Sequence, residues 1–126
     1  MAIREILRLG DPRLRQVAKP LANPRDPLVP SLLSDLHDTM AAHSGAGLAA
    51  PQIGVPLRVV VYGTGAINPR YPNEVAVPRT VLINPVLTPI GDAQQQGWEG
   101  CLSVPGLRGQ VCLLYTSDAA DDTPCV

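Results

Sequence analysis

The placement of proline is the feature that most constrains the start of this chain. Five prolines fall within residues 1–30: Pro12, Pro20, Pro24, Pro27 and Pro30. Proline lacks a backbone N–H donor and disfavours helical geometry in the residue before it. Residues 1–30 are therefore predicted to form an extended arm with short turns. Ile3, Ile6 and Leu7 are the apolar residues expected to pin this arm to the core.

The next segment carries a clear helical pattern. Its apolar residues recur at the spacing of one helix face: Val29, Leu32, Leu33, Leu36 and Met40. The pattern predicts a helix over roughly residues 28–43. Ser31 or a nearby turn residue is expected to cap its start, and Gly45 is expected to adopt a left-handed conformation at its exit.

Short apolar runs after the helix indicate strands. Residues 57–62 are rich in β-branched side chains, which predicts a buried strand, and residues 64–78 are expected to form a loop. Residues 81–90 are predicted to form a strand interrupted at Pro85, with residues 94–101 returning as its antiparallel partner. One helix followed by bunched strands indicates an α+β fold, with mostly antiparallel strands packed on a helix.

Composition narrows the class of protein. A hydrophobic content of 45% and a charged content of 17% are typical of one soluble globular domain. The ten basic residues are scattered and aromatic residues are few, which argues against a nucleic-acid partner. No apolar run has the length of a membrane helix or signal peptide, so we expect no membrane partner and a cytoplasmic setting. Three cysteines in no regular spacing argue against a disulfide framework.

Two polar residues lie in settings that suggest chemistry. Cys101 follows Gly100 at the predicted end of a strand, where a thiolate could face a metal or a substrate. The alternative for Cys101 is a buried small hydrophobic side chain. Gln52 ends the apolar run 48–51, where its amide needs hydrogen-bond partners and can donate to a developing oxyanion; its alternative is a surface position.

Two glycines precede Gln52 in the chain. Gly45 and Gly47 let the backbone pass close to a ligand or to another chain segment, because no Cβ blocks the approach.

Two segments resemble motifs of a known family. GAGLAAPQ (residues 45–52) and EGCLS (residues 99–103) are similar to the first two motifs of peptide deformylases, in the right order and at a plausible separation. The start IREILRLGDPRLR and the helix leading into Gly45 also resemble that family. The similarity runs over roughly residues 3–111, so residues 1–111 are expected to form a partial peptide deformylase domain.

The resemblance implies a role for each matching residue. Cys101 would be the thiolate ligand of a catalytic metal, which in the family is Fe²⁺, replaceable by Ni²⁺, Co²⁺ or Zn²⁺. Gln52 would donate a hydrogen bond to the formyl oxygen, together with the backbone N–H of Leu102. The reaction would remove the formyl group from the N-terminal formylmethionine of newly made proteins and release formate.

The resemblance also implies how a peptide binds. The backbone segments that would pair with an extended N-formylmethionyl peptide are Gly45, Ala46, Gly47 and Gly100. Glu99 and Arg108 would support the mouth of the groove. The partners would be nascent chains at the ribosome, and the protein would be a monomer in a bacterial-type cytoplasm or an organelle.

The third family motif, H-E-x-x-H, is missing from this chain. The only histidines are His37 and His43, which on a helix would point about 120° apart and are no matched ligand pair. A solvated helix face is expected for His37 and a helix end for His43. With two His ligands and the general acid/base Glu absent, we expect weak metal binding and little or no turnover.

The last residues differ from the rest. Residues 112–126 contain Asp118, Asp121 and Asp122 and no basic residue. This tail resembles translated read-through sequence more than it resembles the family, and a short native acidic tail is the alternative. It is expected to be poorly ordered.

Two other functions stay open on sequence grounds. A thiol hydrolase would use Cys101 as nucleophile and His37 or His43 as base. A non-catalytic module would keep only the peptide groove around Gly45 and Gly100 and bind an extended peptide by strand addition.

Overall fold

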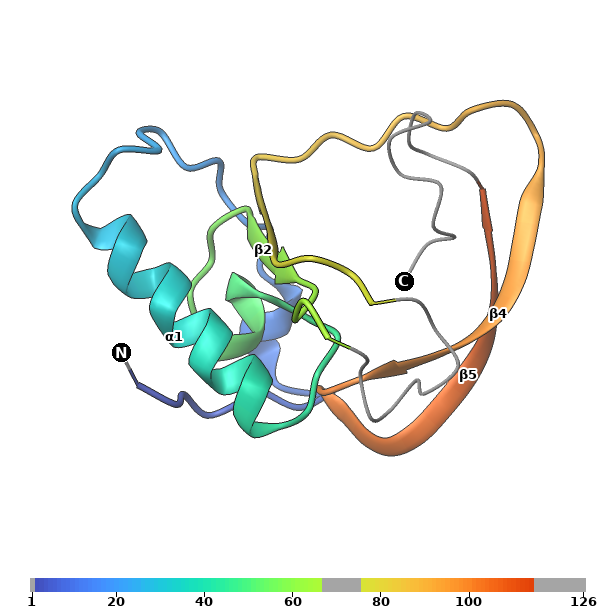
Figure 1. Cartoon of the computed structure of the whole chain (residues 1–126), viewed down its shortest axis with the longest axis horizontal. Coiled ribbons are helices and arrows are strands. Elements are labelled where there is room, and N and C mark those ends of the chain that lie inside the picture. The colour runs from blue at the N-terminus through green and yellow to red at the C-terminus, as the bar shows by residue number, and fades with distance from the viewer. Residues whose placement is uncertain (1, 67–75, 115–126) are drawn as a thin grey trace. The chain divides into compact units, whose positions relative to one another are not determined.

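The computed structural model describes residues 2–66 and 76–114, and the chain divides into two compact units, residues 1–85 and 86–126. Most of the predicted tail (115–126) and most of the predicted loop (67–75) lie outside the described residues, whereas residues 112–114 belong to a strand. The first unit contains η1 (Pro12–Arg15), α1 (Leu28–Ala42), β1 (Gly47–Ala49), η2 (Ala50–Ile53), β2 (Val59–Tyr62) and β3 (Thr80–Ile83), and the second contains β4 (Gln94–Cys101) and β5 (Val104–Leu114) (Figure 1).

The predicted helix is confirmed, and of its two ends only the exit differs from expectation. At the start, the nearby turn residue Asp26 takes the expected role: its Oδ1 accepts the Leu28 N–H at 2.9 Å. At the end, Ser44 rather than Gly45 takes the left-handed conformation, with φ of 53°. The Gly45 N–H then donates to the Met40 carbonyl at 2.9 Å, and the Ser44 N–H to that of Ala41 at 3.2 Å. This pair of bonds requires the left-handed residue one position before Gly45.

The first unit holds an antiparallel sheet in the order β1-β2-β3, and α1 packs against β1 and β2. The predicted strand over 57–62 is confirmed as β2, in which burial alternates along the strand because successive side chains point to opposite faces. The core combines the two elements: Leu36 and Met40 of α1, Leu48 of β1, and Val59 and Val61 of β2 are all buried.

The strand predicted over 81–90 is shorter than expected. It ends at Ile83, because Asn84 turns into the left-handed region with φ of 52°. The Asn84 side chain holds the arm: its Oδ1 accepts the Leu21 N–H at 2.7 Å and its Nδ2 donates to the Leu21 carbonyl at 2.9 Å. Tertiary hydrogen bonds to the arm thus end the strand before Pro85.

The extended arm is confirmed, with η1 as its regular segment among the described residues before α1. Leu7 and Leu21 are its buried anchors, 4% and 9% exposed. Ile6 is half-buried, whereas Ile3 is 65% exposed, so the expectation that Ile3 pins the arm is wrong.

The second unit is an antiparallel hairpin of β4 and β5. Residues 94–101 do form a strand, but its partner is β5 and not the strand near residue 81, which pairs with β2 instead. The ladder runs to the pair Gln94 and Leu114, three residues past position 111. With one helix and antiparallel strands, the α+β expectation is confirmed.

Candidate active site

Gln52 lies in η2, the short helical turn that follows β1 directly. Its side-chain Oε1 accepts the Ala49 N–H at 2.9 Å, and its own carbonyl accepts the Leu7 N–H at 2.7 Å. The half-buried amide is therefore fixed through its oxygen, with the NH₂ group as its donor end. The expectation that an amide here needs partners is confirmed, and a fully exposed position is wrong.

The glycine segment before η2 is shaped by its neighbour β2. A Cβ at Gly47 would lie 3.3 Å from both the Tyr62 Cβ and the Val61 carbonyl oxygen, closer than most side chains tolerate. Gly63 N–H also donates to the Ala46 carbonyl at 3.0 Å. The sequence predicted that these glycines let the backbone pass close to a ligand or to another chain segment. At Gly47 the close neighbour is another chain segment, β2. β1 itself lies at one edge of the described sheet.

Cys101 is the last residue of β4 and pairs with Val104 across a two-residue turn. The register of the ladder shifts between Gly100 and Cys101, so the irregularity lies directly beside the residue that bears the thiol. Cys101 is exposed, which rules out the alternative of a buried hydrophobic side chain. The half-buried Leu102, the predicted backbone donor, follows directly in the turn.

Glu99 and Arg108 occupy the same ladder but opposite faces of it. Glu99 pairs with Gly109 and Arg108 with Gly100, and consecutive pairs point to opposite sides. Glu99 is half-buried and Arg108 is exposed. The hairpin does not bring these two side chains together.

Both histidines lie on or just after α1. His37 is half-buried, and its Nδ1 is buried with no hydrogen-bond partner among the described residues. Burial, followed by the charge of Arg79, lowers the pKa of His37. The expected solvated face is therefore wrong for His37. The helix end is confirmed for His43, whose Nδ1 lies 2.9 Å from the Thr39 carbonyl oxygen.

The donor set of a catalytic metal does not assemble from the part of the chain that is described. Within residues 2–66 and 76–114, no three His, Cys, Asp or Glu side chains cluster closely enough to hold a metal ion. Cys101 supplies one thiolate, and an open catalytic site takes about three protein ligands. The described residues alone therefore do not fit a resident metal.

Gln52 belongs to the first unit and Cys101 to the second. Each is described within its own unit, and their convergence on a shared ligand stays a prediction.

Sequence reasoning missed Asp35 and Thr39. Both are buried on α1, next to the core residues Leu36 and Met40. Their i, i+4 spacing, directly before two apolar positions, was a signal that the sequence did offer.

Within the described ranges, no helix is both long enough and apolar enough to cross a bilayer.

Comparison with known proteins agrees with the two motif segments. The family model for polypeptide deformylase matches residues 3–112. Peptide deformylase 1 of Prochlorococcus marinus (strain MIT 9313) is 63% identical over 111 residues, which are 88% of this chain and 58% of that protein. Peptide deformylase 2 of Ralstonia nicotianae is 59% identical over 109 residues, 86% of this chain and 61% of that protein. The chain thus spans about three fifths of the length of these curated relatives.

A solved structure gives the same result for the fold. The Met-Ala-Ser-bound crystal structure of the class I type b peptide deformylase from Acinetobacter baumannii matches with a TM-score of 0.82 and 31% identity, covering 90% of this chain and 72% of that one. Sequence, family model and fold agree, and the chain belongs to the polypeptide deformylase family.

Proposed function

We propose that this chain is part of a peptide deformylase, which hydrolyses the formyl amide of N-formylmethionyl peptides. Water adds to the formyl carbon, the C–N bond breaks, and formate and a free amino terminus are released. Supporting this, the chain matches the family over residues 3–112, and a related structure contains the peptide Met-Ala-Ser. The substrates would be nascent chains at the ribosome, met by a monomeric enzyme in the cytoplasm.

Gln52 is the proposed donor to the formyl oxygen. As the carbonyl carbon becomes tetrahedral, its oxygen gains negative charge and attracts fixed N–H donors. Because Ala49 N–H holds the Gln52 Oε1 at 2.9 Å, the amide keeps one orientation before any substrate arrives. This preorganisation is the observation that carries the proposal, since a donor that needs no reorientation stabilises the transition state more.

Leu102 and Cys101 are the proposed second half of the site. The backbone N–H of Leu102 is the other oxyanion donor, and the Cys101 thiolate is the metal ligand. Both lie at the turn of the β4–β5 hairpin, next to the register shift between Gly100 and Cys101.

The proposed peptide site uses backbone rather than side chains. β1 lies at a sheet edge, where an extended peptide can add as a further strand. Gly45, Ala46 and Gly47 would provide that edge, and Gly100 would pair from the hairpin. Glu99 and Arg108 would contact the peptide near the groove mouth from opposite faces of their ladder.

The family is metal-dependent, and we propose Fe²⁺ as the metal of the intact enzyme, with Ni²⁺, Co²⁺ or Zn²⁺ as substitutes. When bound, the metal would supply a Lewis acid and an activated water. One thiolate from Cys101 cannot hold it tightly, because affinity depends on several ligands in fixed geometry. The chain by itself is therefore proposed to bind metal weakly and to turn over little or no substrate.

The first test measures formate release from formyl-Met-Ala-Ser by the purified chain, with Fe²⁺ under anaerobic conditions or with Ni²⁺. We expect no metal-dependent release above the protein-free background. Robust metal-dependent release would overturn the proposal that this chain is inactive.

The second test adds the part of a relative that this chain does not span. Residues 1–112 are joined to the part of the Prochlorococcus marinus protein that follows the matched region. We expect metal-dependent formate release from this chimera. Its Cys101→Ser variant should lose metal and activity, and its Gln52→Ala variant should keep metal and lose about 10²-fold or more in kcat.

Cys112→Ser in the same chimera is the matched control. Cys112 is also an exposed cysteine of the hairpin, but it has no proposed role. Its substitution should leave metal content and kcat unchanged. An inactive chimera that folds and binds metal, or a fully active Gln52→Ala variant, would contradict the proposed roles.

A further inference from the structure

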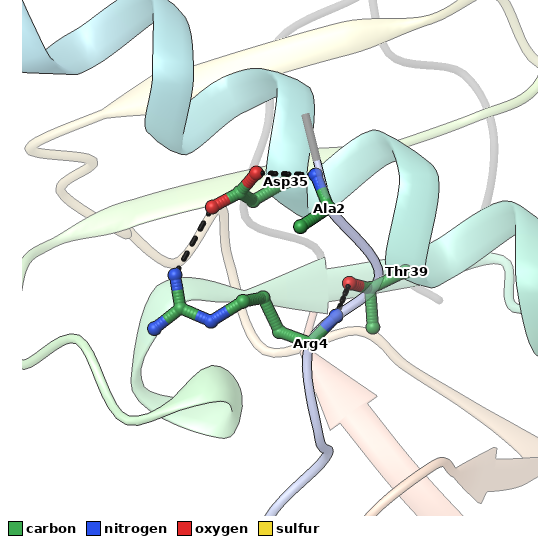
Figure 2. Close-up of polar contacts among 4 residues, drawn as sticks. All are labelled: Ala2, Arg4, Asp35 and Thr39. Carbon is green, nitrogen blue, oxygen red and sulfur yellow. Dashed lines mark hydrogen bonds and ion pairs between the residues drawn. The ribbon is translucent and has the colours of Figure 1, made fainter.

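The start of the chain is fixed to α1 at two neighbouring positions (Figure 2). The Ala2 N–H donates to the Asp35 Oδ1 at 2.8 Å, and the Arg4 Nη1 lies 3.0 Å from the Asp35 Oδ2. One turn further along the helix, the Thr39 Oγ1 accepts the Arg4 N–H at 2.8 Å. Asp35 and Thr39 therefore bind the backbone of the arm at alternate residues.

These two polar side chains are buried, which makes the contacts costly to lose. Asp35 is 8% exposed and Thr39 is 0% exposed. A buried carboxylate or hydroxyl that loses its hydrogen-bond partner pays its full desolvation penalty. Release of the arm would leave the Asp35 carboxylate without its Ala2 and Arg4 donors and the Thr39 hydroxyl without its Arg4 donor.

The other end of the same short segment reaches the candidate active site. Leu7 is 4% exposed, and its N–H donates to the Gln52 carbonyl at 2.7 Å. Gln52 in turn accepts the Ala49 N–H through its side-chain Oε1 at 2.9 Å. Gln52 thus binds the arm through its backbone carbonyl, and its side-chain amide is held by the Ala49 N–H.

We propose that residues 2–7 form a strap that positions Gln52, with Asp35 and Thr39 as the positioning residues that hold the strap on α1. The strap is short, so a shift of Arg4 on the helix is passed to the Leu7 N–H. That N–H fixes the backbone of the turn from which the Gln52 amide projects. The role of the strap in catalysis rests on the proposed function of Gln52.

The test compares Thr39→Val with Thr39→Ser. Valine matches threonine in shape but removes the Oγ1 acceptor, whereas serine keeps it. Hydrogen exchange of individual amides is followed by NMR in the full chain. In Thr39→Val we expect the Leu7 and Ala49 amides to lose about five- to tenfold of their protection relative to the β2 amides. Thr39→Ser should restore both.

The side-chain amide of Gln52 gives a signal that a merely structural role would not move. Its NH₂ resonances should shift in Thr39→Val and return to the wild-type position in Thr39→Ser. Equal loss of protection at Leu7, Ala49 and the β2 amides, or unchanged Gln52 resonances, would overturn the strap.

A second pair keeps the proposal testable should Thr39→Val fail to fold. Asp35→Asn removes the charge that pairs with Arg4, and Asp38→Asn removes an exposed charge from the same helix. Only Asp35→Asn should reduce protection at Leu7 and Ala49. Equal effects of the two variants would overturn the proposal.

The proposed strap and the proposed catalytic role of Gln52 are tested by separate experiments. The exchange experiment needs no activity, and it tests the strap alone. Full activity of the Gln52→Ala chimera would remove the catalytic role of Gln52 while the exchange result for the strap still stands.

Discussion

The two units of this chain differ in how they bury apolar surface. Every buried hydrophobic residue found in the described ranges lies in the first unit: Leu7, Leu21, Val29, Leu36, Met40, Leu48, Ala50, Ile53, Val59 and Val61. In the second unit, Ser103 is the one buried residue among those described, while Trp98 and Leu107 are 64% and 67% exposed. One unit carries a core of its own, and the other is a two-stranded hairpin.

The difference in burial indicates that the first unit provides most of the stability of the fold. A two-stranded hairpin is marginally stable in water unless its apolar side chains pack on something else. A helix packed on a three-stranded sheet buries a continuous core instead. The candidate oxyanion donor Gln52 is therefore built on the stable unit, and the candidate metal ligand Cys101 on the weaker one. Mutations and probes specific to each unit can test whether the two units differ in stability in this way.

The largest expected effect is core truncation in the first unit. Leu36 is 0% exposed, so Leu36→Ala should lower the free energy of unfolding by about 3 kcal/mol. Trp98→Ala, which truncates a larger but mostly exposed side chain of the hairpin, should change it by about 0.5 kcal/mol or less. Urea unfolding followed by circular dichroism measures both.

The wild-type chain also allows the stability of the two units to be compared directly. Trp98 is the only tryptophan, so its fluorescence reports the second unit, while the helical dichroism signal comes from α1 in the first. We expect the fluorescence transition at lower urea. Coincident transitions, or a Trp98→Ala cost equal to that of Leu36→Ala, would show that both units share one cooperative core.

Glycine substitution should give the next largest difference. Gly63 has φ of 79°, and a Cβ there would collide with the Pro78 carbonyl, so Gly63→Ala should cost about 2–3 kcal/mol. At Gly97 in β4, no atom lies within 4 Å of the position that a Cβ would take. Gly97→Ala should therefore leave the free energy of unfolding unchanged or raise it by about 0.5 kcal/mol. Thermal unfolding compares the two. A costly Gly97→Ala would mean that the hairpin is packed more tightly than its exposure indicates.

Asp35 should make the first unit sensitive to acid. The positive charge of the amino terminus, the hydrogen bond from the Ala2 N–H and the Arg4 side chain lower the pKa of Asp35 from 3.8 to about 2. A lowered folded-state pKa stabilises the fold above pH 3.8, and that stabilisation disappears as pH falls toward about 2. The stabilisation is therefore fully present at neutral pH.

Urea unfolding between neutral pH and pH 2 tests this in three proteins. Asp35→Asn should start less stable and lose less stability with acid, whereas Asp38→Asn should follow the wild type, because Asp38 is exposed. An acid dependence in Asp35→Asn as steep as in the wild type would assign the effect to other carboxylates.

Sequence reasoning succeeded where local patterns carried the information. The apolar period located α1 to within about one residue, and the β-branched run located β2. The motif segments identified the family without any knowledge of packing. These features depend on residues that are close together in the chain.

Features set by tertiary partners were missed. β5 contains Pro105, Gly106 and Gly109 and shows no strand alternation, so its pairing with β4 could not be foreseen. The end of β3 at Asn84 depends on hydrogen bonds to Leu21, far away in the chain. Asp35 and Thr39 each precede a core residue in the sequence, but which segment covers them depends on tertiary hydrogen bonds to the arm.

The smallest expected effect concerns the cysteines of the hairpin. Cys101 and Cys112 are both exposed, so iodoacetamide should alkylate them at rates within about threefold in metal-free protein at neutral pH. Peptide mass spectrometry after timed quenching measures each rate. A thiol nucleophile needs a histidine that activates it, and would react more than about tenfold faster than a merely exposed cysteine. Such a preference for Cys101 would favour the thiol-hydrolase alternative, whereas similar rates agree with a thiolate that acts only when a metal is bound.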